Sequence, residues 1–325
     1  MVFCCLKYCR ILNVQSLFLP GGLVLSFIVA WWLPEPGSQL KDLGLIPWMV
    51  VTIFLVNGYQ TNLKELPRDR QFIYALIVAG IMALLVAPLI GLGVTQLLAL
   101  PAGLALGILV KAAVPPTLST CIVMTQLSNG YPLWALIITV VLNLIGVFTL
   151  PFMLGLTLDT QGGLEIDPLP LLKSLVLLVL IPFLAGLILR RLLSVDPGHL
   201  LLRYLPSSCI VLTVWMALSS SHDIFQTLEL NVLWQIILAT WLIHFSLMAL
   251  AYLSSRVLQL DPRARIAMLF TVSQKTLPVA ISVLAALDQT LPIGEAILAC
   301  VLFHFLMLFT DSLLEPKLRL PALAK

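Results

Sequence analysis

The sequence predicts an all-α protein that crosses a lipid bilayer many times. Of its 325 residues, 60% are hydrophobic and only 10% are charged, and the mean hydropathy is +1.07. Soluble domains carry about 25% charged residues, so a water-soluble fold of this size could not hide so much apolar surface. We therefore expect the lipid bilayer to surround the chain. The net charge of +3 does not indicate nucleic-acid binding, and we expect none.

Ten apolar stretches follow one another along the chain, and each suits a membrane helix of about 20 residues. Turn residues or charges separate them, as in PEPG, LPAG and SNGYP. Lys7 and Arg10 precede the first stretch as in a signal peptide, but no small-residue cleavage site closes it, so we expect a retained helix. The stretches lie at 17–33, 44–61, 72–98, 103–128, 132–156, 171–193, 206–221, 231–255, 264–288 and 292–314.

The basic residues predict the orientation of these ten spans. With the N-terminus inside, 14 of the 18 Lys and Arg residues fall in cytoplasmic segments, and only Lys41 and Lys173 fall outside. We therefore expect both termini in the cytoplasm. The short termini and lean loops favour a bacterial inner membrane. Cys4, Cys5 and Cys9 would then be free thiols on the reducing side, with lipidation or metal binding as the alternative.

The two remaining lysines, Lys111 and Lys275, fall inside spans 4 and 9, and each precedes a proline. Pro115 and Pro278 are 163 residues apart, and Asn143 and His304 are 161 apart in the following spans. An odd number of spans per half would invert the second half. We therefore predict inverted five-helix repeats over residues 1–158 and 171–325, joined by an outside linker at 159–170. Proline breaks a helix, so we predict broken helices 4 and 9.

Polar residues beside these breaks are the candidate binding residues. Lys275 lies 12 residues after Arg263 and 13 before Asp288, near the midplane, where a lysine costs about 2.5–3.5 kcal/mol to insert. It therefore needs a partner or a watery cavity, whereas Lys111 could reach toward the outer face. The candidates are Lys111, Pro115, Thr117, Ser119, Thr120, Thr139, Asn143, Ser273, Gln274, Lys275, Thr276 and His304.

Three further polar residues lie in apolar spans. His244 and His304 could each be a satisfied core histidine or part of a proton relay. Asp311 lies toward the predicted inner end of the last span, so we expect it at the membrane interface.

Two segments resemble a known family. PPTLSTCIVMTQLSNG followed by NLIG resembles the first crossover segment of the bile acid:sodium symporter superfamily. SQKTLPVAI resembles the second crossover in the branch of solute carrier family 10 member 7 and its bacterial and fungal relatives. The resemblance implies a panel domain of helices 1, 2, 6 and 7 and a core domain of helices 3–5 and 8–10. Helices 4 and 9 would cross near the midplane, and substrate would bind between the domains during alternating access.

The resemblance also shows where this chain departs from sodium-coupled members. Those members carry a glutamate and a glutamine at the second crossover, where this chain has Thr271 and Lys275. Ser119, Thr120 and Thr139 match polar sodium ligands, so a residual sodium site is one expectation. A lysine ammonium beside that site would repel Na⁺.

Our hypothesis is that Lys275 takes the place of a coupling cation and donates to carbonyls freed near Pro115 and Pro278. Its proton could then be the coupled ion, or the ammonium could bind an anionic substrate directly. The coupling ion would be Na⁺ or H⁺, and we expect no other cofactor.

The predicted function is secondary active transport of a small solute, an organic anion, without conventional sodium coupling. HExxH, paired GxGD and GxSxG motifs do not occur, so we do not expect an enzyme. The alternative is a regulatory membrane protein of calcium homeostasis with little transport of its own, because the resembled branch is linked with that process. The sequence does not determine the oligomeric state.

Overall fold

The computed structural model describes residues 18–19, 21–61, 67, 69–159, 167–193, 196, 199–222, 230–287, 291 and 293–321. Throughout these residues the regular structure is helical and no strand occurs, which confirms the all-α class. Cys4, Cys5 and Cys9 lie outside the described residues, as do residues 160–166 of the predicted linker.

Among the described helices, seven are long and apolar enough to cross a membrane, or nine if each of two bent pairs is one span. The bent pairs are α2 (Pro34–Asp42) with α3 (Leu45–Gln60), and α6 (Ala102–Ala113) with α7 (Leu118–Leu127). A shorter apolar helix occupies Gly21–Trp32. The ten-span count and the inverted repeat therefore stay predictions. The seven helices are Arg70–Leu97, Pro132–Leu158, Pro168–Leu192, Leu200–Ser219, Leu230–Val257, Pro262–Ala286 and Ile293–Leu318.

The segment PEPGSQLKD, expected to be a loop, forms α2, which meets α3 at 79°. Pro34 and Pro36 did not prevent this, because a proline in the first turn loses no helical hydrogen bond. Lys41, in the last turn, donates to Ser220 Oγ at 2.8 Å. This contact joins α2 to the end of α11 (Leu200–Ser219).

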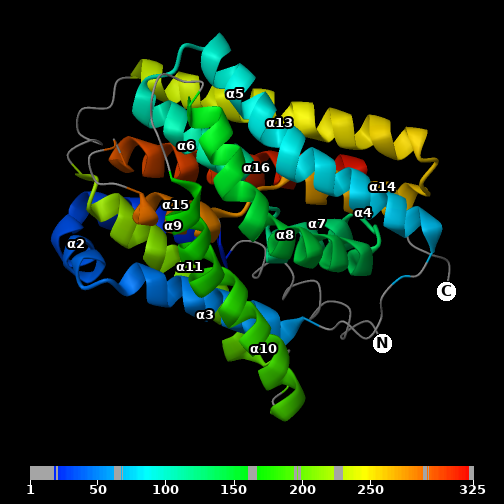
Figure 1. The fold of residues 1–325 in the computed structure, drawn as a ribbon, viewed down its shortest axis with the longest axis horizontal. Helices are drawn as coiled ribbons and strands as arrows, with labels where there is room; N and C mark the ends of the chain where they lie inside the picture. Colours follow the sequence, from blue (N-terminus) through cyan, green and yellow to red (C-terminus); the bar gives the residue numbers. More distant parts are fainter. Residues whose placement is uncertain are drawn as a thin grey trace.

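One group of helices, which we call the panel group, consists of α2, α3, α10 (Ile181–Leu192) and α11. In Figure 1, α3 and α10 lie side by side in the lower part of the molecule. Glycines allow this approach. A Cβ on Gly58 would lie 2.1 Å from Phe183 O, and one on Gly186 would lie 2.1 Å from Leu55 O.

A second group, the core group, surrounds α6, α7, α14 (Pro262–Ser273) and α15 (Leu277–Ala286). α6 packs against α5 and α16, and α14 packs against α13 and α8 (Figure 1). The core group thus brings together segments far apart in the chain. Its other helices are α4 (Arg70–Gly80), α5 (Ala87–Leu97), α8 (Pro132–Asp159), α13 (Leu230–Val257) and α16 (Ile293–Leu318).

Two helices contain a π-helical segment that ends two residues before a proline. η1 (Ile81–Val86) joins α4 to α5, and η2 (Val176–Leu180) joins α9 (Pro168–Leu175) to α10. In η1 the Ala87 N–H bonds to Met82 O, five residues back. The next donor in this pattern would be residue 88, a proline without an N–H. The Ala83 carbonyl is therefore left for a donor from elsewhere.

Both predicted helix breaks are present. α6 ends at Ala113 and α7 begins at Leu118, with a bend of 63°. α14 ends at Ser273 and α15 begins at Leu277. Between them, Val114–Thr117 and Gln274–Thr276 are extended or irregular, so their backbone groups need partners outside their own helices.

Candidate functional site

The two helix breaks lie against each other in the core group. The Thr276 N–H donates to Pro115 O at 2.9 Å, which joins the breaks through the backbone. Lys111 Nζ donates to Lys275 O at 2.8 Å, and Lys275 Nζ donates to Val114 O at 3.2 Å. Each break thus receives a lysine from the other half of the chain.

Lys275 is fully buried and its ammonium is surrounded by backbone carbonyls. Besides Val114 O, it donates to Ala83 O at 2.5 Å. Ala83 O is the carbonyl that Pro88 leaves without a helical donor, and Val114 O precedes the Pro115 break. A buried carbonyl without a donor costs about 1–3 kcal/mol, so the ammonium replaces two missing donors at once.

Lys111 is also fully buried and does not reach toward the outer face. Its Nζ lies 3.2 Å from His304 Nδ1, which is itself 3.2 Å from Lys275 O. The ring of Phe303 lies 6.0 Å from the ammonium. The predicted residues Lys111, Lys275 and His304 therefore form one cluster behind the crossing point.

Gln274 connects the first break to the last helix. Its Oε1 accepts from Thr117 Oγ1 at 3.0 Å and from Thr120 Oγ1 at 2.7 Å. The two threonine hydroxyls also contact each other. Gln274 Nε2 donates to Asp311 Oδ2 at 2.7 Å. The amide thus spans from the first turn of α7 to α16.

Asp311 and His244 extend this network, and the expected interfacial position of Asp311 stays a prediction. Its side chain is fully buried, and its Oδ1 lies 3.0 Å from His244 Nε2. The packing of α13 against α16 encloses it. A signal was present in the sequence, because Asp311 follows His304 by seven residues and therefore shares its helical face.

Of the two predicted site residues on α8, Asn143 contacts the first break and Thr139 bonds within its own helix. Asn143 Nδ2 donates to Pro116 O at 2.9 Å, so it caps a carbonyl of the first break. The Thr139 hydroxyl donates within its own helix, to Ala135 O at 2.7 Å and Leu136 O at 2.9 Å. It makes no hydrogen bond to Ser119 or Thr120 in the described part of the chain. The residual sodium site that joins these three residues stays a prediction.

Ser273 ends α14, and its backbone and side chain differ in their partners. Its carbonyl lies 3.3 Å from His244 Nδ1. Its hydroxyl is buried and has no hydrogen-bond partner among the described residues. Ser273 therefore contributes to the site through its backbone.

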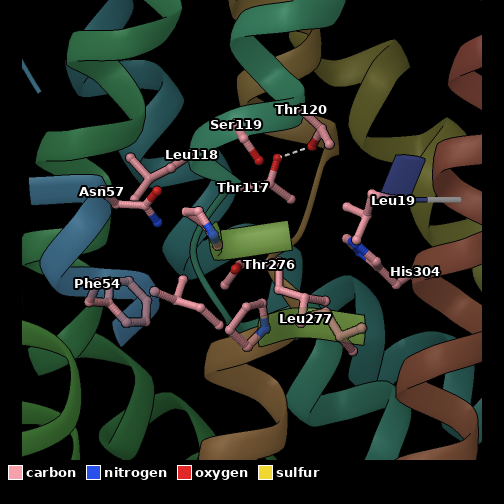
Figure 2. A pocket seen from close by; sticks show the side chains of 14 residues that line it. Leu19, Phe54, Asn57, Thr117, Leu118, Ser119, Thr120, Thr276, Leu277 and His304 are labelled. Atoms are coloured by element: carbon pink, nitrogen blue, oxygen red, sulfur yellow. Dashed lines mark hydrogen bonds between the residues drawn. The ribbon is translucent and has the colours of Figure 1, made fainter. Parts of the chain in front are cut away.

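A pocket lies between the panel and core groups, in front of the crossing point. Figure 2 shows Phe54 and Asn57 of α3 facing the first turn of α7 and the start of α15 across this space. A neighbouring pocket shares Ser119 and Thr120. Its other wall includes Arg203, Tyr204 and Ser207 of α11.

The N-termini of α7 and α15 both border the first cavity. Thr117 is the N-cap of α7, and its Oγ1 accepts from the Cys121 N–H at 3.3 Å. Thr276 is the N-cap of α15 without a side-chain cap. Helix N-termini carry partial positive charge and free N–H groups, which favour anions. The two helix N-termini therefore favour negative charge at this wall of the cavity.

Comparison with known proteins places the chain in a family. Across 316 residues, 92% of this chain, it is 26% identical to a probable sodium/metabolite cotransporter BASS4, chloroplastic, of rice, covering 75% of that protein. The Arabidopsis protein of the same name is 29% identical over 66% of this chain and 52% of its own length. An uncharacterized protein of Pseudomonas aeruginosa is 30% identical over 92% of this chain and 93% of its own.

A family model described as the SBF-like CPA transporter family matches residues 17–320. This match confirms the resemblance to the bile acid:sodium symporter type and the prediction of a transporter rather than an enzyme. The chain belongs to the SBF-like CPA transporter family.

Proposed function

We propose that this protein is a secondary active transporter of a small organic anion. The observation that carries the proposal is the cavity onto which the N-terminal turns of α7 and α15 open. Lys111 and Lys275 lie directly behind these turns and add positive charge. Apolar residues such as Phe54 and Ile210 complete the wall and suit the organic part of a solute.

Alternating access would arise from movement between the two groups of helices. The cavity walls come from both groups, with α3 and α11 on one side and the helix breaks on the other. The breaks are joined to each other by hydrogen bonds, so the core group can move as one body. A solute held between the groups would then be exposed to either side in turn.

We expect transport without conventional sodium coupling. In this protein the ammonium of Lys275 occupies the crossing point and uses the Ala83 and Val114 carbonyls. A second cation at the same carbonyls would meet strong repulsion in a medium of low dielectric constant. The plant relatives are named as sodium/metabolite cotransporters, and their names support a small metabolite as substrate.

Ligand binding to the purified protein in nanodiscs tests this function. Thermal melts would be recorded with potassium acetate, lactate, succinate, citrate and phosphate. Any anion that raises the melting temperature would then be used, radiolabelled, for uptake into proteoliposomes. Asn57→Ala alters the cavity wall. We expect this variant to need an at least fivefold higher anion concentration for the same rise in melting temperature.

Thr52→Ala is the matched control, because Thr52 lies on the same helix and, among the described residues, its hydroxyl donates to Trp48 O of that helix. It should leave the anion response unchanged. An equal loss of the melting-temperature response in Asn57→Ala and Thr52→Ala would contradict the proposed site. Uptake that persists in Leu277→Trp, whose larger side chain fills the cavity, would also contradict it.

A further inference from the structure

A chain of hydrogen bonds leads from the cavity into the interior of the core group. It begins at Thr117 and Thr120, which line the cavity, and passes through Gln274 to Asp311 and His244. Gln274, Asp311 and His244 are fully buried. A carboxylate and an imidazole inside a membrane protein are costly to keep there unless they have a function.

The atoms that face His244 favour a proton shared with Asp311. Nδ1 faces the Ser273 carbonyl at 3.3 Å, and a carbonyl can only accept, so a hydrogen bond between them requires the proton on Nδ1. Nε2 faces Asp311 Oδ1 at 3.0 Å. Either Nε2 also carries a proton and Asp311 is ionised, or Asp311 carries that proton and Nε2 accepts it. Without it, two acceptors would face each other in a buried site.

The other charged or titratable groups nearby are directed elsewhere. The Lys275 ammonium faces Ala83 O and Val114 O, and the Lys111 ammonium faces Lys275 O and His304. The Cys121 thiol donates to Phe270 O at 3.3 Å. Glu315, one turn beyond Asp311, pairs with Arg319. Among the described residues, Gln274 and His244 are the hydrogen-bond partners of the Asp311 carboxylate.

We propose that the Asp311–His244 pair is the proton-binding site that couples H⁺ to anion transport. This inference rests on the proposed function and names its coupling ion. With its proton the pair is neutral. When the proton leaves to water in the cavity, the pair becomes a carboxylate facing a neutral imidazole, with one net negative charge.

The Asp311–His244 pair would act on the cavity through charge. In a low-dielectric interior, a net negative charge repels an anion at the other end of the Gln274 chain. Protonation removes that repulsion, so proton and anion would bind together and move in the same direction. The site differs from Lys275, whose ammonium already has two carbonyl partners that hold its charge in place.

The first test measures proton occupancy with no solute added. The chain has four histidines, so nitrogen NMR of ¹⁵N-histidine-labelled protein can be assigned with single His→Gln variants. At pH 7 we expect either a doubly protonated His244 ring or a neutral ring together with an infrared band of a protonated carboxyl that Asp311→Asn removes. A neutral ring beside an ionised Asp311 would overturn the proposal.

The second test measures proton movement. Proteoliposomes on a solid-supported membrane would receive pH jumps without any solute, and the displaced charge would be recorded. We expect Asp311→Asn to reduce the displaced charge at least tenfold. Glu315→Gln, on the same helix, should leave it within about a factor of two. If Asp311→Asn does not fold, His244→Gln replaces it. Undiminished displacement in the folded variant would overturn the proposal.

Failure of this inference differs from failure of the proposed function. Displaced charge that depends on Asp311, without any anion uptake, would support the proton site and contradict the transported anion. Anion uptake that an imposed pH gradient does not drive, and that Asp311→Asn retains, would support the transporter and contradict the proton site.

Discussion

At the scale of single residues, a lysine of this protein donates hydrogen bonds to backbone carbonyls that lie beside proline interruptions of the helices. Pro88 leaves Ala83 O without a donor, and Pro115 interrupts α6 after Val114. The Lys275 ammonium donates to both carbonyls. The Lys275 side chain is therefore held by backbone carbonyls.

A double-mutant cycle tests this relation. Lys275→Met leaves Ala83 O without a donor, but Pro88→Ala supplies an N–H that can reach it. We expect Lys275→Met to lower the free energy of unfolding by about 1 kcal/mol less in the Pro88→Ala background than in the wild-type background. Chemical denaturation in detergent measures it.

Pro182→Ala is the matched background, because Pro182 also follows a π-helical segment but lies in the panel group. No coupling with Lys275 is expected there. Equal effects of Lys275→Met in all three backgrounds would contradict the role of Ala83 O. Full transport activity in Lys275→Ala would contradict any functional role for this lysine.

Sequence reasoning identified Lys111, Lys275, Gln274 and the threonines, because charge and hydroxyls beside prolines are conspicuous in apolar spans. It did not pair Asp311 with His244, because it considered only the distance along the chain to the helix end. The burial of Asp311 depends on the packing of α13 against α16, which the order of residues in one span does not reveal.

At the scale of elements, glycine and proline decide how the helices meet. The extended segments between the half-helices, predicted from Pro115 and Pro278, allow backbone contact between the two breaks. Helix α2 was not predicted, since PEPG reads as a turn when its tertiary contacts are unknown. Close contact of α3 and α10 depends on Gly58 and Gly186, where each backbone touches the other helix.

A substitution on α3 tests this contact. Gly58→Ala would place a methyl group 2.1 Å from Phe183 O, so α3 and α10 must separate. We expect a loss of about 1–3 kcal/mol in unfolding free energy, as for other overpacked sites. Gly93→Ala is the control, because nothing lies within 4 Å of its added Cβ. A loss in Gly93→Ala as large as that in Gly58→Ala would contradict the packing argument.

At the scale of the whole molecule, the panel and core groups enclose the cavity, and the segment after α16 joins turns of the core group. Leu320 N donates to Ser128 O at 3.1 Å, and Asn129 Nδ2 donates to Leu320 O at 2.7 Å. Arg263 donates to Pro321 O at 2.8 Å. The segment after α16 therefore lies on the same side as the turns after α7 and before α14, the side predicted to be cytoplasmic.

Cysteine labelling in intact bacterial cells tests this orientation. In a background without the six native cysteines, Asp42→Cys should react with a membrane-impermeant maleimide from outside. Gln259→Cys, in the exposed turn between α13 and α14, should react only after permeabilisation. The reverse pattern would contradict the positive-inside assignment and place the C-terminal segment outside.

The most direct test of the central claim compares sodium with other cations. Purified protein would be melted in NaCl, KCl and choline chloride at equal ionic strength. A cation bound at 100 times its dissociation constant stabilises a protein by about 2.7 kcal/mol, which a melting curve resolves. Because the Lys275 ammonium occupies the crossing point, we predict the same melting temperature in all three salts. A shift specific to sodium would contradict the claim that this lysine replaces the coupling cation.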